Sequence, residues 1–234
     1  MRWSSPTIFK PLHGAKSQLS LQHEAGYKSC MEFKLAPHYS FSTNWYEHLT
    51  QSAERIYNFE SATALRFDPT AKRVIIEIGI FEGASTCWWS DNLLDHPESR
   101  LYSIDPFTGS EEHHASESMR ALLPSIEATA RRNIAMSKNA SKVNIIKGCS
   151  WDVFPVLAKF LDQQVDILYI DGAHDAISIC RDSSLYYPLV KKGGAVIWDD
   201  YTNEDCHRSI NGAVVLFCPL DEVFALYGQL WGVK

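Results

Sequence analysis

Acidic residues close two apolar segments in the second half of the chain. Asp171 ends the first segment, and Asp199 and Asp200 end the second. Both segments are typical of buried parallel strands, whose carboxyl ends meet at one edge of a sheet. Carboxylates brought together in this way repel one another unless a cation lies among them, and oxygen ligands suit Mg²⁺ or a similar hard cation. The pattern predicts a metal site at Asp171, Asp199 and Asp200, although capping and turn formation also account for an Asp-Asp pair.

His174 follows Asp171 by three residues, at the start of an expected helix. A neutral imidazole can take a proton from a hydroxyl near neutral pH. A metal beside it would bind a pair of substrate hydroxyls and lower their pKa. We therefore interpret Asp171 and His174 as catalytic, with His174 as the general base. The alternative is a helix-start histidine that is hydrogen-bonded to backbone.

A second candidate site lies earlier in the chain, at the end of the apolar run that begins at Val74. Its string is Glu77-Ile-Gly79-Ile-Phe81-Glu-Gly83. Glycines after a buried strand let the backbone turn sharply and approach a ligand. A dinucleotide-binding fold needs GxGxxG, but here the middle glycine is absent and an acid precedes the first. A carboxylate in that place repels a diphosphate and suits a cation. The string therefore favours S-adenosylmethionine, which carries a sulfonium and an ammonium group, over the NAD of an oxidoreductase.

Polar residues further along the chain complete the expected cofactor site. Ser85 and Thr86 open the next helix, whose N–H groups and hydroxyls suit the carboxylate of the ligand. Asp105 ends the second strand, where an acid usually binds ribose hydroxyls; alternatively, it caps the turn before Pro106. Phe107 is expected to lie against the adenine, although a loop aromatic as often packs within the protein.

The elements that must position these residues alternate between strands and helices. Short apolar runs predict strands at Val74–Gly79, Arg100–Asp105, Val143–Lys147, Val165–Asp171 and Ala195–Asp199. The segments between them predict helices at Ser85–Leu94, Met119–Ser137, Trp151–Leu161 and Ala173–Val190. This alternation is typical of a doubly wound, Rossmann-like α/β fold with a mainly parallel sheet.

Some segments depart from the simple alternation. The polar stretch Pro106–Glu117 predicts a loop, and within it Thr108–Ser118 is expected to be solvated, with a substrate lid as the alternative. Pro124 is expected to interrupt the helix that follows, because proline lacks a backbone N–H. A helix-like segment, Ile210–Phe217, precedes two apolar runs around a glycine, which predict a C-terminal antiparallel hairpin of Glu222–Leu226 and Leu230–Lys234.

The chain divides into two parts on this basis. Residues 1–69 are expected to form an N-terminal arm and cap, irregular up to residue 44 and helical over 45–65, where the apolar positions suit an amphipathic helix. Residues 70–234 are expected to form the cofactor-binding domain.

Composition and charge bear on the partners. The net charge of −6 disfavours nucleic acid and anionic membranes as partners, and no apolar run approaches the ~20 residues that span a bilayer. The N-terminus lacks the apolar core of a secretory signal, so we expect a cytoplasmic protein. The acid-free stretch 1–23, with Arg2, Lys10 and Lys16, leaves an organellar transit signal as the alternative. The six cysteines contain no CxxC pair and are expected to be free.

Four motifs stand in order at the ends of the expected strands. They are Glu77-Ile-Gly79…Gly83-Ala-Ser85-Thr86, Ile104-Asp105-Pro106, Ile170-Asp171-Gly172-Ala-His174 and Gly193-Gly194…Asp199-Asp200-Tyr201. Together they resemble the class I S-adenosylmethionine-dependent methyltransferases, and within them the branch of macrocin-type sugar O-methyltransferases from antibiotic pathways. The resemblance spans residues 70–234. It implies a seven-stranded sheet with one inserted antiparallel strand, a metal at Asp171, Asp199 and Asp200, and His174 as the base.

One position departs from the family pattern. Many members have an acid after the third strand that binds the adenine amino group, but this chain has Cys149 there. Ser150 or a backbone group is then expected to take that role. The cofactor-binding set is accordingly Glu77, Gly79, Phe81, Gly83, Ser85, Thr86, Asp105, Pro106, Phe107, Cys149, Ser150 and Asp171.

The function expected from these residues is methyl transfer from S-adenosylmethionine to a hydroxyl of a small molecule. A sugar or polyketide-type product is favoured over a catechol because of the Asp171–His174 pair. The alternatives are a metal-independent or N-methyltransferase, and a non-catalytic protein that kept the cofactor-binding fold. We expect a small hydroxylated substrate as the partner; a homo-oligomer is compatible with the sequence.

Overall fold

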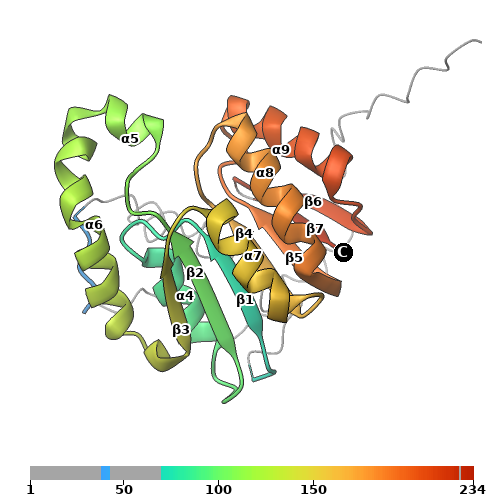
Figure 1. Cartoon of the computed structure of the whole chain (residues 1–234), viewed down its shortest axis with the longest axis horizontal. Coiled ribbons are helices and arrows are strands. Elements are labelled where there is room, and N and C mark those ends of the chain that lie inside the picture. The colour runs from blue at the N-terminus through green and yellow to red at the C-terminus, as the bar shows by residue number, and fades with distance from the viewer. Residues whose placement is uncertain (1–37, 43–69, 227) are drawn as a thin grey trace, which may run out of the picture. The chain divides into compact units, whose positions relative to one another are not determined.

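A seven-stranded sheet organises the chain, in the spatial order β3-β2-β1-β4-β5-β7-β6 (Figure 1). The computed structural model describes residues 38–42, 70–226 and 228–234, so the predicted cap helix over 45–65 lies outside the described residues. The strands are β1 Val74–Ile78, β2 Arg100–Asp105, β3 Val143–Lys147, β4 Val165–Ile170, β5 Val190–Trp198, β6 Glu222–Leu226 and β7 Gln229–Val233. Strands β1 to β5 pair in parallel, which confirms the predicted Rossmann-like α/β fold.

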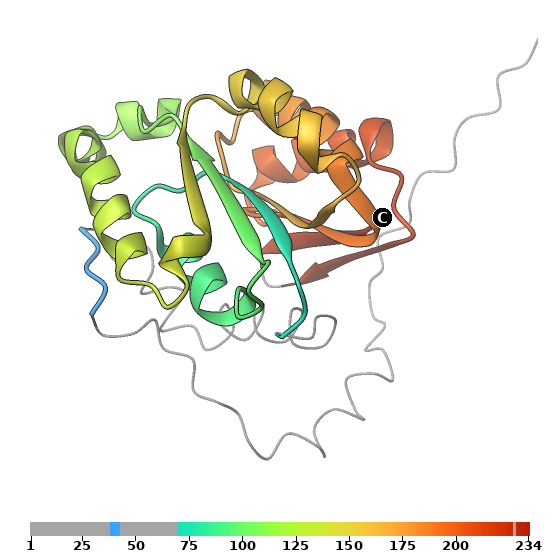
Figure 2. The ribbon, with the colours of Figure 1, turned by 60° about the horizontal axis from the view of Figure 1, so that its bottom comes forward.

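Helices cover both faces of this sheet. They are α4 Ala84–Leu93, α5 Glu111–Ala115, α6 Glu117–Ala135, α7 Ser150–Leu161, α8 Ala176–Tyr186 and α9 Glu204–Phe217. Helix α4 lies on one face, and α7, α8 and α9 lie on the other (Figure 2). Helix α6 packs against α4. A sheet covered on both faces explains why its strands are nearly continuous apolar runs.

The core divides according to the faces of the strands. Ile75 and Ile167 pack with Trp89 of α4 in one buried cluster, whereas Ile76 and Leu168 belong to the cluster on the opposite face. Successive side chains of a strand point to opposite faces, so neighbours in the sequence enter different clusters. Strand β4 is buried at all six positions, as expected for the central strand of the seven.

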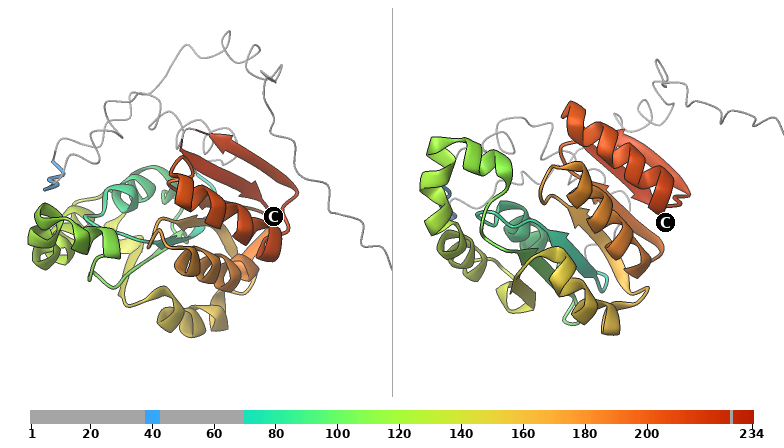
Figure 3. Two further views of the ribbon diagram at one scale, coloured as in Figure 1. Left: turned by 90° about the horizontal axis from the view of Figure 1, so that it is seen from above. Right: turned by 45° about the horizontal axis from the view of Figure 1, so that its top comes forward.

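The C-terminal hairpin is confirmed. Strand β7 pairs antiparallel with both β5 and β6, so it lies between the parallel strands and the edge (Figure 3). None of the helices in the described part of the chain is long and apolar enough to cross a membrane. The cysteines that the structure describes are free, as predicted; Cys30 lies outside the described residues.

Two predictions for the segment after β2 are wrong. The polar stretch 106–117 is not a plain loop, because it contains α5, which begins after Ser110 with a reciprocal capping box to His113. Pro124 does not interrupt the next helix, because α6 runs continuously from Glu117 to Ala135. Pro124 and Arg120 are exposed, so water can serve the Arg120 carbonyl that loses its helical donor.

Element boundaries also differ near the C-terminus. Strand β5 begins at Val190 rather than Ala195, and its register is irregular where it pairs with Val165 and Ile167 of β4. Helix α9 begins at Glu204 rather than Ile210, because the side chain of Asn203 caps it. Helix α8 begins three residues later than predicted, at Ala176, and ends at Tyr186 before a 3₁₀ turn.

A short N-terminal segment, residues 38–42, contacts the domain. The Tyr39 hydroxyl donates to Asp91 of α4 at 2.7 Å, and the Ser42 amide donates to the Glu82 carboxylate at 2.8 Å. The Ser40 carbonyl accepts from Asn133 of α6 at 3.0 Å. These contacts hold the segment against the loop that follows β1.

Candidate active site

The loop after β1 requires glycine at two positions. Gly79 has a φ of 95°, and a Cβ there would lie 1.8 Å from the carbonyl oxygen of Asp171. Gly83 has a φ of 88° and precedes α4, with the Ile134 side chain 3.2 Å from where its Cβ would be. The loop therefore passes directly beside the carboxyl end of β4, which only a residue without a side chain permits.

Asp105 fixes this loop from the end of β2. Its Oδ2 accepts from the amides of Ile80 at 2.7 Å and Phe81 at 3.0 Å, and its Oδ1 accepts from the Phe107 amide at 2.6 Å. Phe81 and Phe107 both have positive φ, 50° and 57°, a conformation that costs free energy in residues with a side chain. The Asp105 carboxylate offsets this cost by accepting from the amides of Phe81 and Phe107. Asp105 also lines the cavity described next.

A cavity of about 230 Å³ lies at the carboxyl ends of β1 to β4. Most of the predicted cofactor-binding residues line it, namely Gly79, Phe81, Asp105–Phe107, Cys149–Ser150 and Asp171. The sequence analysis missed other lining residues, among them Ile126 of α6, Trp151 of α7 and Asp182 of α8. Asp182 had a signal in the sequence, since it is an acid at helical spacing on the otherwise largely apolar buried face of α8.

Glu77, Ser85 and Thr86 are not among the residues that line the cavity. Glu77 is fully buried, and the hydroxyls of Ser85, Thr86 and Ser103 each donate to its carboxylate at 2.6 Å. Burial raises the pKa of Glu77 to about 7, because desolvation of the charge outweighs the three hydroxyl donors. The hydroxyls of Ser85 and Thr86, which we expected to meet the ligand, thus link α4 to β1 through Glu77.

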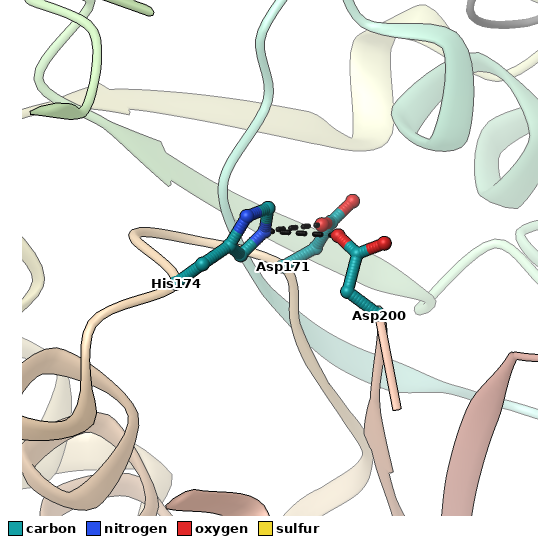
Figure 4. A group of neighbouring side chains, drawn as sticks. All are labelled: Asp171, His174 and Asp200. Carbon is teal, nitrogen blue, oxygen red and sulfur yellow. Dashed lines mark ion pairs between the residues drawn. The ribbon is translucent and has the colours of Figure 1, made fainter. Parts of the chain in front are cut away.

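Asp171, His174 and Asp200 meet at the ends of β4 and β5 (Figure 4). Nε2 of His174 lies 3.0 Å from Oδ2 of Asp200 and 3.8 Å from Oδ1 of Asp171. One potential ligand atom from each residue lies within 4.8 Å of the others, which is a spacing suited to one metal ion. Asp171 also lines the cavity, so this cluster adjoins it directly.

Asp199 lies outside that group of three. Its Oδ2 accepts from the Tyr169 hydroxyl at 2.5 Å, and its Oδ1 accepts from the Asp200 amide at 2.9 Å. The same Tyr169 hydroxyl reaches Oδ2 of Asp171 at 3.0 Å. Tyr169 therefore links the carboxylates of Asp171 and Asp199. The group of three whose ligand atoms lie close enough for one metal ion contains His174 where the predicted set had Asp199.

The charges of the cluster act on one another. Burial and the neighbouring Asp199 charge raise the pKa of Asp171 to about 7. Burial lowers the pKa of His174, but hydrogen bonds to Asp171 and Asp200 and the charges of both outweigh burial and raise it to about 12. The two carboxylates therefore favour the charged form of the His174 imidazole, whose positive charge offsets part of their repulsion.

Helix α5 reaches the same cluster from the other side. Oε1 of Glu112 lies 2.9 Å from Nδ1 of His174, so both ring nitrogens of the histidine face carboxylates. The neighbouring His113 stacks on Phe81 of the glycine loop, with ring centroids 5.4 Å apart. The segment that we expected to be a solvated loop thus contributes two side chains to the site.

Comparison with known proteins identifies the family. The methyltransferase domain family matches residues 76–201, more than half of the chain and the part that carries β1 to β5. The chain belongs to the methyltransferase domain family. A relative in Acanthamoeba polyphaga mimivirus, the uncharacterized protein R132, is 33% identical over 130 residues. The match covers 54% of this chain and 50% of the relative, so the chain spans about half the length of the curated relative.

Solved methyltransferase structures share the fold. The O-methyltransferase TomG from Streptomyces achromogenes, involved in tomaymycin synthesis and solved with S-adenosylmethionine, aligns with a TM-score of 0.54 at 20% identity, over 74% of this chain and 77% of that chain. A TDP-rhamnose 3′-O-methyltransferase of calicheamicin biosynthesis aligns with a TM-score of 0.53 at 17% identity, over 80% and 85%. At these identities the likeness establishes the fold alone.

Proposed function

We propose that this methyltransferase-family protein transfers a methyl group from S-adenosylmethionine to a hydroxyl of a small molecule. One observation carries the proposal. Asp171 lines the cavity and also belongs to the carboxylate–histidine cluster, so a ligand in the cavity and a hydroxyl at His174 would adjoin. A reaction between two bound molecules requires this proximity.

The charge of the cavity supports a cationic, phosphate-free cofactor. Three acids line it, Asp105, Asp171 and Asp182, and no lysine or arginine is among its lining residues in the described part of the chain. A dinucleotide brings a diphosphate, which would meet carboxylates without a compensating cation. The sulfonium and ammonium of S-adenosylmethionine meet the same carboxylates favourably.

The cluster fits a divalent cation. Two half-buried carboxylates, an imidazole and the adjacent Asp199 form a donor set suited to a hard or borderline ion. Asp171 and Asp200 would hold it, with Asp199 as the third ligand of the proposed set. A bound cation of this kind lowers the pKa of a hydroxyl that coordinates it.

The catalytic steps assigned to the chain itself are proton transfer and alignment. His174 accepts the hydroxyl proton at Nε2, the nitrogen that faces Asp171 and Asp200, while Glu112 holds Nδ1. A cation among the carboxylates competes with the proton for their charge, which favours the neutral imidazole that a base requires. As the new O–C bond forms the S–C bond breaks, so no covalent enzyme intermediate is needed.

We place a sugar or polyketide-type product ahead of a catechol as the acceptor.

Calorimetry with S-adenosylhomocysteine and with NAD tests the cofactor. We expect binding of the first and none of the second, because no lysine or arginine of the described residues lines the cavity to meet a diphosphate. If S-adenosylhomocysteine does not bind, the proposed function is wrong.

Labelled-methyl transfer tests the reaction. The full-length protein is assayed against hydroxylated sugars, polyketides, catechols and amines, with Mg²⁺ and with a chelator. Transfer to hydroxyls that the chelator abolishes supports the proposal, and chelator-insensitive transfer or transfer to amines alone contradicts it.

His174→Ala should lower turnover by ~10²–10⁴-fold, the usual contribution of a general base. If Asp199 is the third metal ligand, Asp199→Asn should weaken the dependence of turnover on Mg²⁺. If Asp199→Asn keeps that dependence and His174→Ala loses it, His174 is the third ligand and the assignment of Asp199 is wrong.

A further inference from the structure

One wall of the cavity carries a carboxylate that the expected cofactor-binding set did not include. Asp182 of α8 is 4% exposed, and its side chain lines the cavity together with Ser150 and Trp151. The Ser150 hydroxyl donates to its Oδ1. Within the described part of the chain no second donor reaches this carboxylate, which is uncommon for a buried acid.

The free oxygen, Oδ2, lies beside the carboxyl end of β4. A Cβ placed on Gly172, another residue of the cavity wall, would be 3.5 Å from it. The neighbouring Arg181 does not pair with it, because its guanidinium lies over the Trp151 ring, 4.3 Å from the centroid. A buried oxygen with open lone pairs that faces a cavity is suited to an N–H donor of a ligand.

Apolar side chains line other parts of the cavity. Ile104, Phe107 and Ile126 line it and are buried, with exposures of 1%, 8% and 2%. Such walls suit a flat aromatic ring. Burial raises the pKa of Asp182 to about 6, so the group is mostly ionised at neutral pH and acts as an acceptor.

We propose that Asp182 is a specificity-determining residue for the base of the cofactor, and that its Oδ2 accepts the exocyclic amino group of adenine. This inference rests on the proposed function. In the proposed function Asp105 and the glycine loop serve the ribose and amino-acid parts of the ligand, so the base is assigned to the part of the cavity lined by Ser150, Trp151 and Asp182. Cys149 lines the same wall, but a thiol is a weak acceptor, and the acid reaches the cavity from α8 instead.

Wild-type protein provides the first test. Its affinity for S-adenosylhomocysteine is compared by calorimetry with its affinity for S-inosylhomocysteine, in which a carbonyl oxygen replaces the amino group. We expect the inosine analogue to bind about tenfold to hundredfold more weakly, because its oxygen would face a carboxylate. Equal affinities would overturn the assignment of Asp182, whereas binding of neither compound would refute the proposed function itself.

The variant Asp182→Asn provides the second test. The amide has nearly the same shape, can still bond to Ser150, and offers an N–H₂ donor to the carbonyl of the inosine analogue. We expect the preference to invert, with S-adenosylhomocysteine bound more weakly and S-inosylhomocysteine more tightly than by wild type. Asp152→Asn is the matched control, since it makes the same change at an exposed acid of α7 that is not among the lining residues of the cavity, and its preference should remain that of wild type. A ratio unchanged in Asp182→Asn would show a structural role only.

Discussion

The carboxylate of Glu77 illustrates the balance of forces at single residues. It is fully buried beneath three hydroxyl donors, yet its pKa is raised to about 7. Hydroxyl donors stabilise the charge, but transfer of the charge out of water costs more. The sequence analysis placed this acid at the ligand because of its position before the glycine loop. In the structure its side chain bonds to residues of α4 and β2, and the sequence does not reveal these partners.

Substitution of Glu77 tests this balance. The pKa is raised from 4.5 to about 7 in the folded state, so the folded protein binds the proton more tightly than the unfolded chain does. Stability contributed by the protonated form is therefore present at low pH and is lost as the pH rises from 4.5 to about 7.

We expect Glu77→Gln to reduce the fall in unfolding free energy between about pH 5 and about pH 8 by up to about 3 kcal/mol. Urea unfolding followed by circular dichroism at several pH values measures it. Asp171 and Asp182, whose pKa values are also raised, keep part of the pH dependence in the variant. A profile identical to that of wild type would contradict the prediction.

At the scale of elements, loops and helix ends decide which side chains reach the site. Asn203 starts α9 earlier than the apolar pattern indicated, and Ser110 starts a helix within a polar stretch. Both are local capping signals that were present in the sequence. The effect of this helix on the site could not be predicted from the sequence, because only the packing of α5 brings Glu112 to His174.

Two glycine-to-alanine substitutions separate the demands of a loop from those of a helix. In Gly79→Ala, the new methyl would overlap the Asp171 backbone, so we expect loss of S-adenosylhomocysteine binding and a large loss of stability. In Gly212→Ala, within α9, a Cβ would meet nothing within 4 Å. We expect that variant to gain about 0.5–1 kcal/mol.

Thermal and urea unfolding of both variants, with calorimetry, measure these effects. Gly212→Ala serves as the control for the chemistry of the substitution itself. Wild-type stability in Gly79→Ala would show that the loop and β4 are further apart than the structure has them.

At the scale of the whole molecule, the C-terminal hairpin completes the sheet. Trp231 of β7 is 1% exposed, packs in the cluster of Ala195 and Ile197, and stacks on Phe224 with centroids 6.1 Å apart. The last strand of the chain thus fills the core beside β5, whose end carries two of the site carboxylates. The hairpin itself was predictable from its two apolar runs and the glycine between them.

We expect Trp231→Ala to lower the unfolding free energy by about 3–5 kcal/mol, because it leaves a cavity in a buried cluster. Urea unfolding measures the loss. Phe224→Ala, on the partly exposed edge strand, is the comparison and should cost less. A loss below about 1 kcal/mol for Trp231→Ala would contradict this account of the hairpin.

The sequence by itself determined the fold class, the positions of the strands and the acids at their ends. Apolar runs and glycines are local signals, and the carboxyl ends of parallel strands share one edge whatever the details of packing. It was thus enough to place Asp105 and Asp171 on one cavity.

Only the tertiary structure decided which acids meet. Asp199 and Asp200 are adjacent in the sequence, yet one bonds to Tyr169 and the other to His174. Adjacent side chains at a strand end point in different directions. The left-handed backbone of Asp200, with a φ of 54°, sets the direction of the Asp200 side chain. Glu112 and Asp182 reach the site from helices, whose packing depends on contacts between residues far apart in the chain.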